Sequence, residues 1–282
     1  FGNDFCSRLP YTIDRYWISY IQRKGGRPVL KAVASNIAQA LQSRGFLIGF
    51  LAVICLLFLS SIEGILSAFR SDTLLQNGYH AAFVMDSLSS DAMTLALPIV
   101  VALPYTASFV EDVKSGFIKA YLPRTTTNGY ILGKLTACAI SGGLALVLGI
   151  LAAYGLSALL FTPMEAALAE GAESPAYFAE FLGKVLLFFC SGAFWALIGL
   201  LFATLTGSRY MAYASPFVIY YVLIILYERY FDTLYVLYPK EWLLPSTRWC
   251  FGNLSVVIWV GELIIIVSLC FYLAAKRRLR QI

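Results

Sequence analysis

Few side chains in this sequence have the chemistry that catalysis requires. His80 is the single histidine of the 282 residues, so a multi-histidine metal site cannot be built from this chain. It lies in a connection between apolar segments, where no serine–histidine pair can form inside a membrane, and we expect an ordinary surface residue. The six cysteines form no Cys-x-x-Cys pair, and most are predicted to be small buried hydrophobic residues. We therefore predict that the chain is not an enzyme.

A short motif over residues 129–134, GYILGK, has some likeness to a phosphate-binding loop. Only three residues separate its glycines where the ATP-binding loop has four, and Leu135 replaces the required Ser or Thr. No strand signal precedes it. We therefore predict no ATP site, no cofactor and no metal ion in this chain.

Three charged residues fall within apolar segments, namely Glu63, Lys184 and Glu262. A charge in hydrocarbon is costly and calls for a partner or a function. Glu63 and Glu262 are therefore candidates for a polar substrate path. The alternative is that these side chains reach out to the membrane surface or make packing contacts.

The composition defines the solvent in which these residues act. Apolar residues make up 60% of the chain and charged residues 13%, with a mean hydropathy of +0.75. Soluble domains carry about 25% charged residues, roughly twice this share. The composition excludes a soluble globular protein, a disordered chain and a nucleic-acid-binding protein.

Six apolar segments are long enough to cross a bilayer as helices, which takes about 20 residues. They cover residues 46–68, 92–110, 130–160, 177–206, 211–227 and 254–275. The predicted fold is therefore all-α, with a six-span transmembrane domain over residues 46–275. Small residues spaced four apart in the third segment predict close helix packing. These residues are Ser141, Ala145, Gly149, Ala153 and Ser157.

The positions of Lys and Arg predict the orientation of the spans. With six spans, sixteen of these residues fall on one side and four on the other. The side rich in Lys and Arg stays in the cytoplasm. Both termini are therefore predicted to be cytoplasmic, including a basic, aromatic segment over residues 1–27 and a basic tail over 276–282.

Residues 28–44 are predicted to form an amphipathic helix before the first span. Its polar residues, Asn36 among them, lie away from an apolar stripe. The stripe consists of Val29, Val33, Ile37 and Leu41. Because the segment is too polar to cross, we expect it in the cytoplasmic interface of the membrane. The alternative is a helix packed on a soluble partner.

The connection over residues 228–253 is rich in Tyr and Trp but too short to cross, and Pro239 and Pro245 interrupt it. Aromatic residues of this kind gather at membrane interfaces. We predict a re-entrant or surface-lying hairpin before the last span.

The cytoplasmic connection over residues 111–134 contains the most informative pattern. A short helix over 112–122, between Glu111 and Pro123, would lie just beneath the membrane. Its apolar residues would form a docking surface for a cytosolic partner. The alternative is a loop helix that folds back on the bundle.

This pattern resembles the type-2 permease subunit of ATP-binding-cassette (ABC) exporters. It is carried by Glu111, Ser115, Gly116, Leu122, Pro123, Arg124, Tyr130, Gly133 and Lys134. The overall layout is similar over roughly residues 28–275, whereas residues 1–26 are not covered. By this resemblance, residues 112–122 would be the coupling helix that inserts into a separate ATPase subunit. Its partner-binding residues would be Glu111 at the helix start, Gly116, Phe117, Ile118, Tyr121, Leu122, Pro123 and Arg124.

The resemblance implies a permease subunit in the cytoplasmic membrane of a bacterium. Two ATPase subunits would hold ATP and Mg, and a second permease copy or a paralogue would complete the path. We expect the first, second and fifth spans to line that path with apolar and aromatic side chains. The expected substrate is amphipathic or hydrophobic, such as a peptide antibiotic, a drug, a lipid or a lipid-linked glycan.

A second hypothesis from the residues alone is a self-contained secondary transporter or channel that uses Glu63 or Glu262 as an ion or proton site. Such a protein would show internal repeats and would work without nucleotide. Residues 46–160 and 177–275 share only their apolar character.

Overall fold

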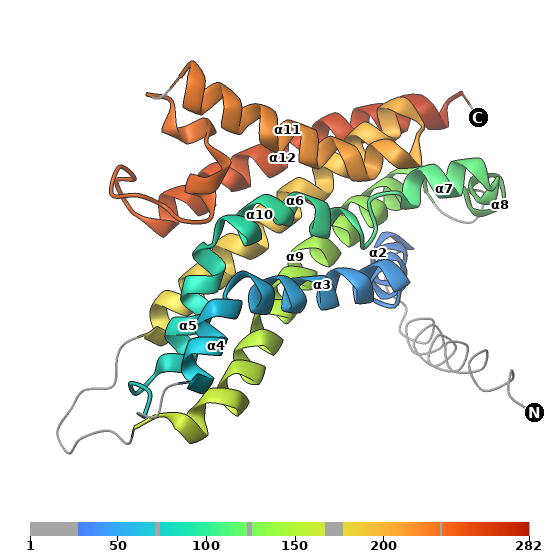
Figure 1. Ribbon diagram of the computed structural model, residues 1–282. Helices are drawn as coiled ribbons and strands as arrows, with labels where there is room; N and C mark the ends of the chain where they lie inside the picture. Colours follow the sequence, from blue (N-terminus) through green and yellow to red (C-terminus); the bar gives the residue numbers. More distant parts are fainter. Residues whose placement is uncertain (1–27, 71–73, 123–125, 167–176, 232, 282) are drawn as a thin grey trace, which may run out of the picture.

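The computed structural model describes residues 28–70, 74–122, 126–166, 177–231 and 233–281, and these residues are helical with short connections (Figure 1). The predicted segment 1–27 lies outside the described residues. The helices are α2 (Pro28–Leu41), α3 (Arg44–Ser60), α4 (Ile62–Arg70), α5 (Tyr79–Ser89), α6 (Asp91–Ala102), α7 (Ser108–Lys114), α8 (Phe117–Tyr121), α9 (Thr127–Phe161), η2 (Thr162–Met164), α10 (Tyr177–Thr206), α11 (Arg209–Arg229), η3 (Tyr235–Leu237), η4 (Pro239–Trp242) and α12 (Asn253–Leu279).

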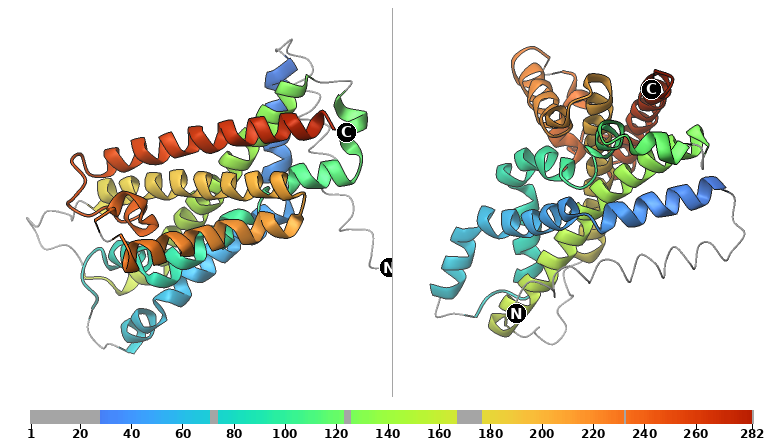
Figure 2. Two further views of the ribbon diagram at one scale, coloured as in Figure 1. Left: turned by 90° about the horizontal axis from the view of Figure 1, so that it is seen from above. Right: turned by 90° about the vertical axis from the view of Figure 1, so that its right-hand side faces the viewer.

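The two longest helices, α9 and α10, pack together at the centre of the bundle. Cβ atoms added to Gly142 or Gly192 would lie 2.6–2.7 Å from side chains of the other helix, so glycine is what permits this close approach. Helices α2 and α3 pack on α9, whereas α11 and α12 pack on α10, as both views of Figure 2 show. All five members of the predicted small-residue stripe on α9 are buried, which confirms its packing role.

Four described helices are long and apolar enough to cross a membrane: Thr127–Met164, Glu180–Thr206, Arg209–Arg229 and Asn253–Leu279. Two bent pairs pass the same test when each is taken together. They are Val29–Leu41 with Arg44–Ser60, bent by 53°, and Tyr79–Ser89 with Asp91–Ala102, bent by 70°. The chain is thus an all-helical protein with four to six candidate membrane-spanning helices, and its composition makes it a multi-pass membrane protein.

The first two predicted spans are not single helices. Residues 46–68 are divided between α3 and α4 at Ser61. Residues 92–110 are divided between α6 and α7, because α6 ends at Ala102 and Pro104, which has no N–H to donate, follows in the turn. Sequence analysis also missed α5, which lies where we expected a loop and buries Phe83 and Leu88.

Helix α2 forms within the predicted segment 28–44, and the face that it buries against protein is not its apolar stripe. The most buried residues are Ala32, Asn36 and Ala40, whereas the predicted apolar stripe is half-buried. The reason is steric, since Gly129 and Gly133 of α9 lie directly against the backbone of α2. Glycine on α9 allows that contact, in which Gly129 meets Val29 and Gly133 meets Ala32 and Asn36.

The connection between α11 and α12 folds back onto the bundle. Trp242 is 1% exposed and its ring stacks on Trp195 of α10 at 5.9 Å between centroids. Lys240 forms an ion pair with Asp91 at the start of α6, with 2.8 Å between Nζ and Oδ1. These contacts fasten η4 to α6 and α10, while its depth in the membrane stays a prediction.

Helices α2, α7 and α8 and the last turns of α12 lie at one end of the bundle, here called the basic end because it carries Lys114, Lys119, Lys276 and Arg280 (Figures 1 and 2). Helix α4, η2 and the α11–α12 connection lie at the opposite end. Two polar clusters, at the two ends of the bundle, join segments that are far apart in the sequence.

Candidate functional site: polar clusters at the two ends of the bundle

The cluster at the basic end is centred on Lys134 of α9. Its side chain is 2% exposed, and its Nζ lies 2.8 Å from Oδ2 of Asp112 on α7. The same Nζ lies 2.9 Å from the hydroxyl oxygen of Tyr105, in the turn between α6 and α7. A buried ion pair of this kind is expensive to break, because the remaining charge would be left without a partner.

Hydrogen bonds extend this cluster to a third helix. The hydroxyl of Tyr130 donates to Oδ2 of Asp112 at 2.7 Å. The hydroxyl of Tyr105 lies 3.1 Å from Oδ1 of Asn36 and 2.9 Å from Oε1 of Gln39, both on α2. Since a phenol has one proton, it donates to one of these two amides at a time. The cluster therefore ties α2, the α6–α7 turn, α7 and α9 together.

This arrangement holds helices in place. The charged atoms of Lys134 and Asp112 face each other, and aromatic rings enclose the ammonium group. Its Nζ lies 4.7 Å from the ring centroid of Tyr105 and 5.9 Å from that of Tyr130. The structural consequence is a rigid attachment of α7 to the bundle.

Beyond this attachment, the chain turns at Gly116, which has φ of +74°. This left-handed conformation favours glycine and ends α7. The predicted single helix over residues 112–122 is therefore wrong, and α7 and α8 take its place. Helix α7 also begins at Ser108, so Glu111 lies within its first turn and not at its start.

The predicted partner-binding residues differ in their exposure. Phe117 is 49% exposed and stacks on Tyr121 at 5.3 Å between centroids. Ile118 is 1% exposed and packs in the core, which removes it from any docking surface. Tyr121 and Leu122 are half-buried, and Gly116 is exposed. Pro123 and Arg124 lie outside the described residues.

Glu111 is exposed and reaches the turn between α10 and α11. Its Oε1 lies 3.6 Å from Nη1 of Arg209. Both side chains are more than half exposed, so the pair contributes little to stability. It does link α7 to a second cytoplasmic connection of the predicted topology.

The two predicted substrate-path residues are not brought together. Glu63 is exposed on α4, where it lines a cavity of about 380 Å³ with Tyr79 and Asp86. Glu262 is exposed on α12, a helix that lies apart from α4 in Figure 1. Lys184 pairs with Glu180 one turn away on α10, with 3.6 Å between Nζ and Oε1.

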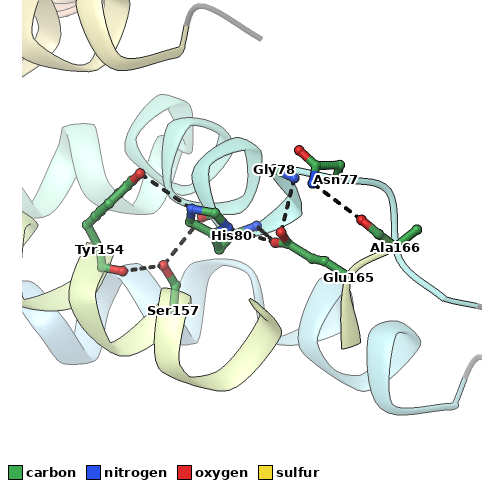
Figure 3. A network of polar contacts seen from close by, with 7 residues as sticks. All are labelled: Asn77, Gly78, His80, Tyr154, Ser157, Glu165 and Ala166. Atoms are coloured by element: carbon green, nitrogen blue, oxygen red, sulfur yellow. Dashed lines mark hydrogen bonds and ion pairs between the residues drawn. The ribbon is translucent and has the colours of Figure 1, made fainter. Parts of the chain in front are cut away.

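The cluster at the opposite end is centred on Glu165, which follows η2 (Figure 3). Its Oε1 lies 2.7 Å from Nδ1 of His80 and accepts the His80 backbone N–H at 2.8 Å. Its Oε2 accepts the backbone N–H of Gly78 at 3.1 Å. Burial acts to raise the pKa of Glu165, but these hydrogen bonds outweigh it and hold the pKa below its ordinary value.

Backbone contacts complete this cluster. The backbone N–H of Leu75 donates to the carbonyl oxygen of Met164 at 2.9 Å. The backbone N–H of Ala166 donates to the carbonyl oxygen of Leu75 at 2.8 Å. His80 is thus part of a network, and its predicted role as an ordinary surface residue is wrong. The hydroxyl of Ser157 donates to the carbonyl oxygen of His80 and not to its ring, so these two residues do not form a serine–histidine pair (Figure 3).

The cysteines and carboxylates of the described residues do not form a metal site. No group of three or more His, Cys, Asp or Glu side chains among them could hold an ion. The prediction that cysteines in apolar runs are buried holds for Cys138 but is wrong for Cys55 and Cys270, which lie on outward faces.

The sequence pattern contained two members of the basic-end cluster. Tyr130 and Lys134 were part of the recognised pattern, but Asp112 and Tyr105 carried no signal that linked them to it. Glu165 was missed entirely, since 85 residues separate it from His80. Comparison of the chain with protein-family models, curated proteins and solved structures gave no match. The clusters are therefore interpreted from their own geometry.

Proposed function

We propose that this chain is the permease subunit of a bacterial ABC exporter, with both termini in the cytoplasm. ATP and Mg would bind to two separate ATPase subunits that contact α7 and α8 at the basic end. A second permease copy or a paralogue would complete the translocation path. Movement of the ATPase subunits would then switch the path between inward and outward access.

The proposal rests chiefly on the buried attachment of α7. A helix that transmits force must be firmly attached to the rest of the bundle. The ion pair between Lys134 and Asp112, together with the hydroxyl of Tyr105, joins α7 to α9 and to α2. A push on α7 would therefore reach the central helix of the bundle and the helix before α3 directly.

The exposed tip of this element supports the same function. Phe117 is an exposed aromatic residue that lies beyond the attachment, and its ring is held by stacking on Tyr121. An aromatic side chain of this kind is a common anchor in protein interfaces. It would fit an apolar cleft of an ATPase subunit.

The substrate expected for this permease is amphipathic or hydrophobic. Helices α3, α6 and α11 correspond to the first, second and fifth predicted spans, and their mean composition is apolar. A path between them would favour a peptide antibiotic, a drug, a lipid or a lipid-linked glycan over a small ion.

The test is copurification of the full chain in detergent from its native host, with and without Phe117→Asp. Phe251→Asp is the matched control, because Phe251 is 78% exposed at the opposite end. We expect an ATPase subunit with phosphate-loop motifs to copurify with the wild type and the control, and to be lost from Phe117→Asp. A chain that purifies alone and moves substrate into liposomes without ATP would overturn the proposal and favour a secondary transporter or channel.

A further inference from the structure

A cavity of about 390 Å³ lies at the basic end, between the first turn of α9 and the last turns of α12. Thr127 and Asn128 line it from α9, Lys276 lines it from the last turn of α12, and Arg280 lines it directly after that helix. The two helices are fastened beside it, since the hydroxyl of Tyr272 donates to Oδ1 of Asn128 at 2.9 Å. The end of α12 therefore places both cations beside the start of α9.

The charge of this cavity is not neutralised within the part of the chain that the structure describes. Neither Lys276 nor Arg280 forms an ion pair with a carboxylate there. Lys276 instead lies 5.5 Å from the ring centroid of Tyr272. Two neighbouring cations that line a cavity with hydroxyl and amide groups match a phosphate group.

The surface of α12 that precedes Lys276 indicates which molecule supplies the phosphate. Leu269 and Leu273 are each 59% exposed on α12. With Lys276 and Arg280 they follow spacings of four, three and four residues, which place all four on one helix face. An exposed apolar stripe thus ends at the two cations. This order matches that of an anionic lipid, whose acyl chain ends at a charged headgroup.

We propose that this cavity binds the phosphate group of an anionic phospholipid, with an acyl chain along Leu269 and Leu273. The cavity lies where the apolar part of α12 ends, which is the depth of the headgroups in a membrane-spanning helix. The bound lipid would bridge α12 and the start of α9. This proposal does not depend on the ABC assignment.

The test is native mass spectrometry of the full chain in detergent, titrated with phosphatidylglycerol and separately with inorganic phosphate. The variants are Lys276→Gln and Arg280→Gln. Arg277→Gln is the matched control, since it removes the same charge from an exposed position of the same turn outside the cavity. We expect each cavity variant to weaken binding of phosphatidylglycerol about fivefold and the control to change it less than about twofold.

Other outcomes would contradict the proposal. Equal losses in all three variants would mean attraction to general surface charge, and no loss in any of them would mean that the cavity does not bind the lipid. If inorganic phosphate binds in a Lys276-dependent way while phosphatidylglycerol does not, the lipid is not the source of the phosphate. Copurification of an ATPase subunit is a separate readout, so failure of either proposal is distinguishable.

Discussion

The two polar clusters both hold distant segments of the chain together, but they differ in strength. Each joins segments that are far apart in the sequence, but the side chains of Lys134 and Asp112 are 2% and 16% exposed, against 6% and 21% for Glu165 and His80. Burial removes the water that would otherwise compensate for a lost partner, so the first cluster resists separation more strongly. Helix α7 is therefore attached to the bundle more strongly than the segment after η2, which the cluster around Glu165 holds.

The largest effect is expected from Lys134→Met, which removes the partner of a buried carboxylate. We expect a loss of about 3 kcal/mol in the free energy of unfolding in detergent, at the low end for a buried pair because Asp112 keeps its bond from Tyr130. Glu111→Gln is the control on the same helix and should change it by less than about 1 kcal/mol. Equal effects of the two variants would show that the pair is not the main attachment of α7.

A smaller effect is expected from Glu165→Ala at the opposite end. The variant loses the acceptor of three hydrogen bonds from His80 and Gly78, and we expect a loss of about 2 kcal/mol. Asp86→Ala removes an exposed carboxylate from the neighbouring α5 and should stay within about 0.5 kcal/mol of the wild type. A Glu165→Ala loss larger than that of Lys134→Met would reverse the comparison.

The smallest effect concerns pH, because the cluster at the opposite end depends on the titratable carboxylate of Glu165. The pKa of folded Glu165 lies below its ordinary value of 4.5, so its carboxylate stabilises the fold fully above that value. This contribution is lost as the pH falls through the lower pKa of the folded chain. In thermal unfolding from pH 7 to pH 3, the gap between wild type and Glu165→Gln should therefore shrink in acid. A gap that widens would mean that the pKa of Glu165 is raised.

The elements of this protein were largely predictable, because they depend on local patterns. Apolar length predicted the long helices α9, α10, α11 and α12, and the four-residue spacing of small residues predicted the buried face of α9. Helix ends that depend on one or two residues were harder to predict. The breaks at Ser61, Pro104 and Gly116 interrupt segments whose average composition is suited to continuous helices.

The contacts of the candidate sites were less predictable. The amphipathic pattern of α2 predicted an apolar stripe for the membrane interface but not the face that packs on protein, where Ala32, Asn36 and Ala40 are buried. A hydrophobic pattern identifies which residues avoid water. In a membrane protein these residues can face either lipid or protein, so the pattern does not show which face packs on another helix. Close packing on Gly129 and Gly133 decided the outcome, and this depends on the other helix.

The sequence by itself determined that this is a helical membrane protein, where its long helices fall and how its positive charge is distributed. These properties depend on the burial and charge of residues that are near one another in the chain. Only the tertiary structure decided that Lys134 meets Asp112, that Glu165 meets His80, and that Lys276 lies beside the start of α9. Polar partners in these clusters are chosen by how helices pack, and no local pattern records which of many distant groups will meet.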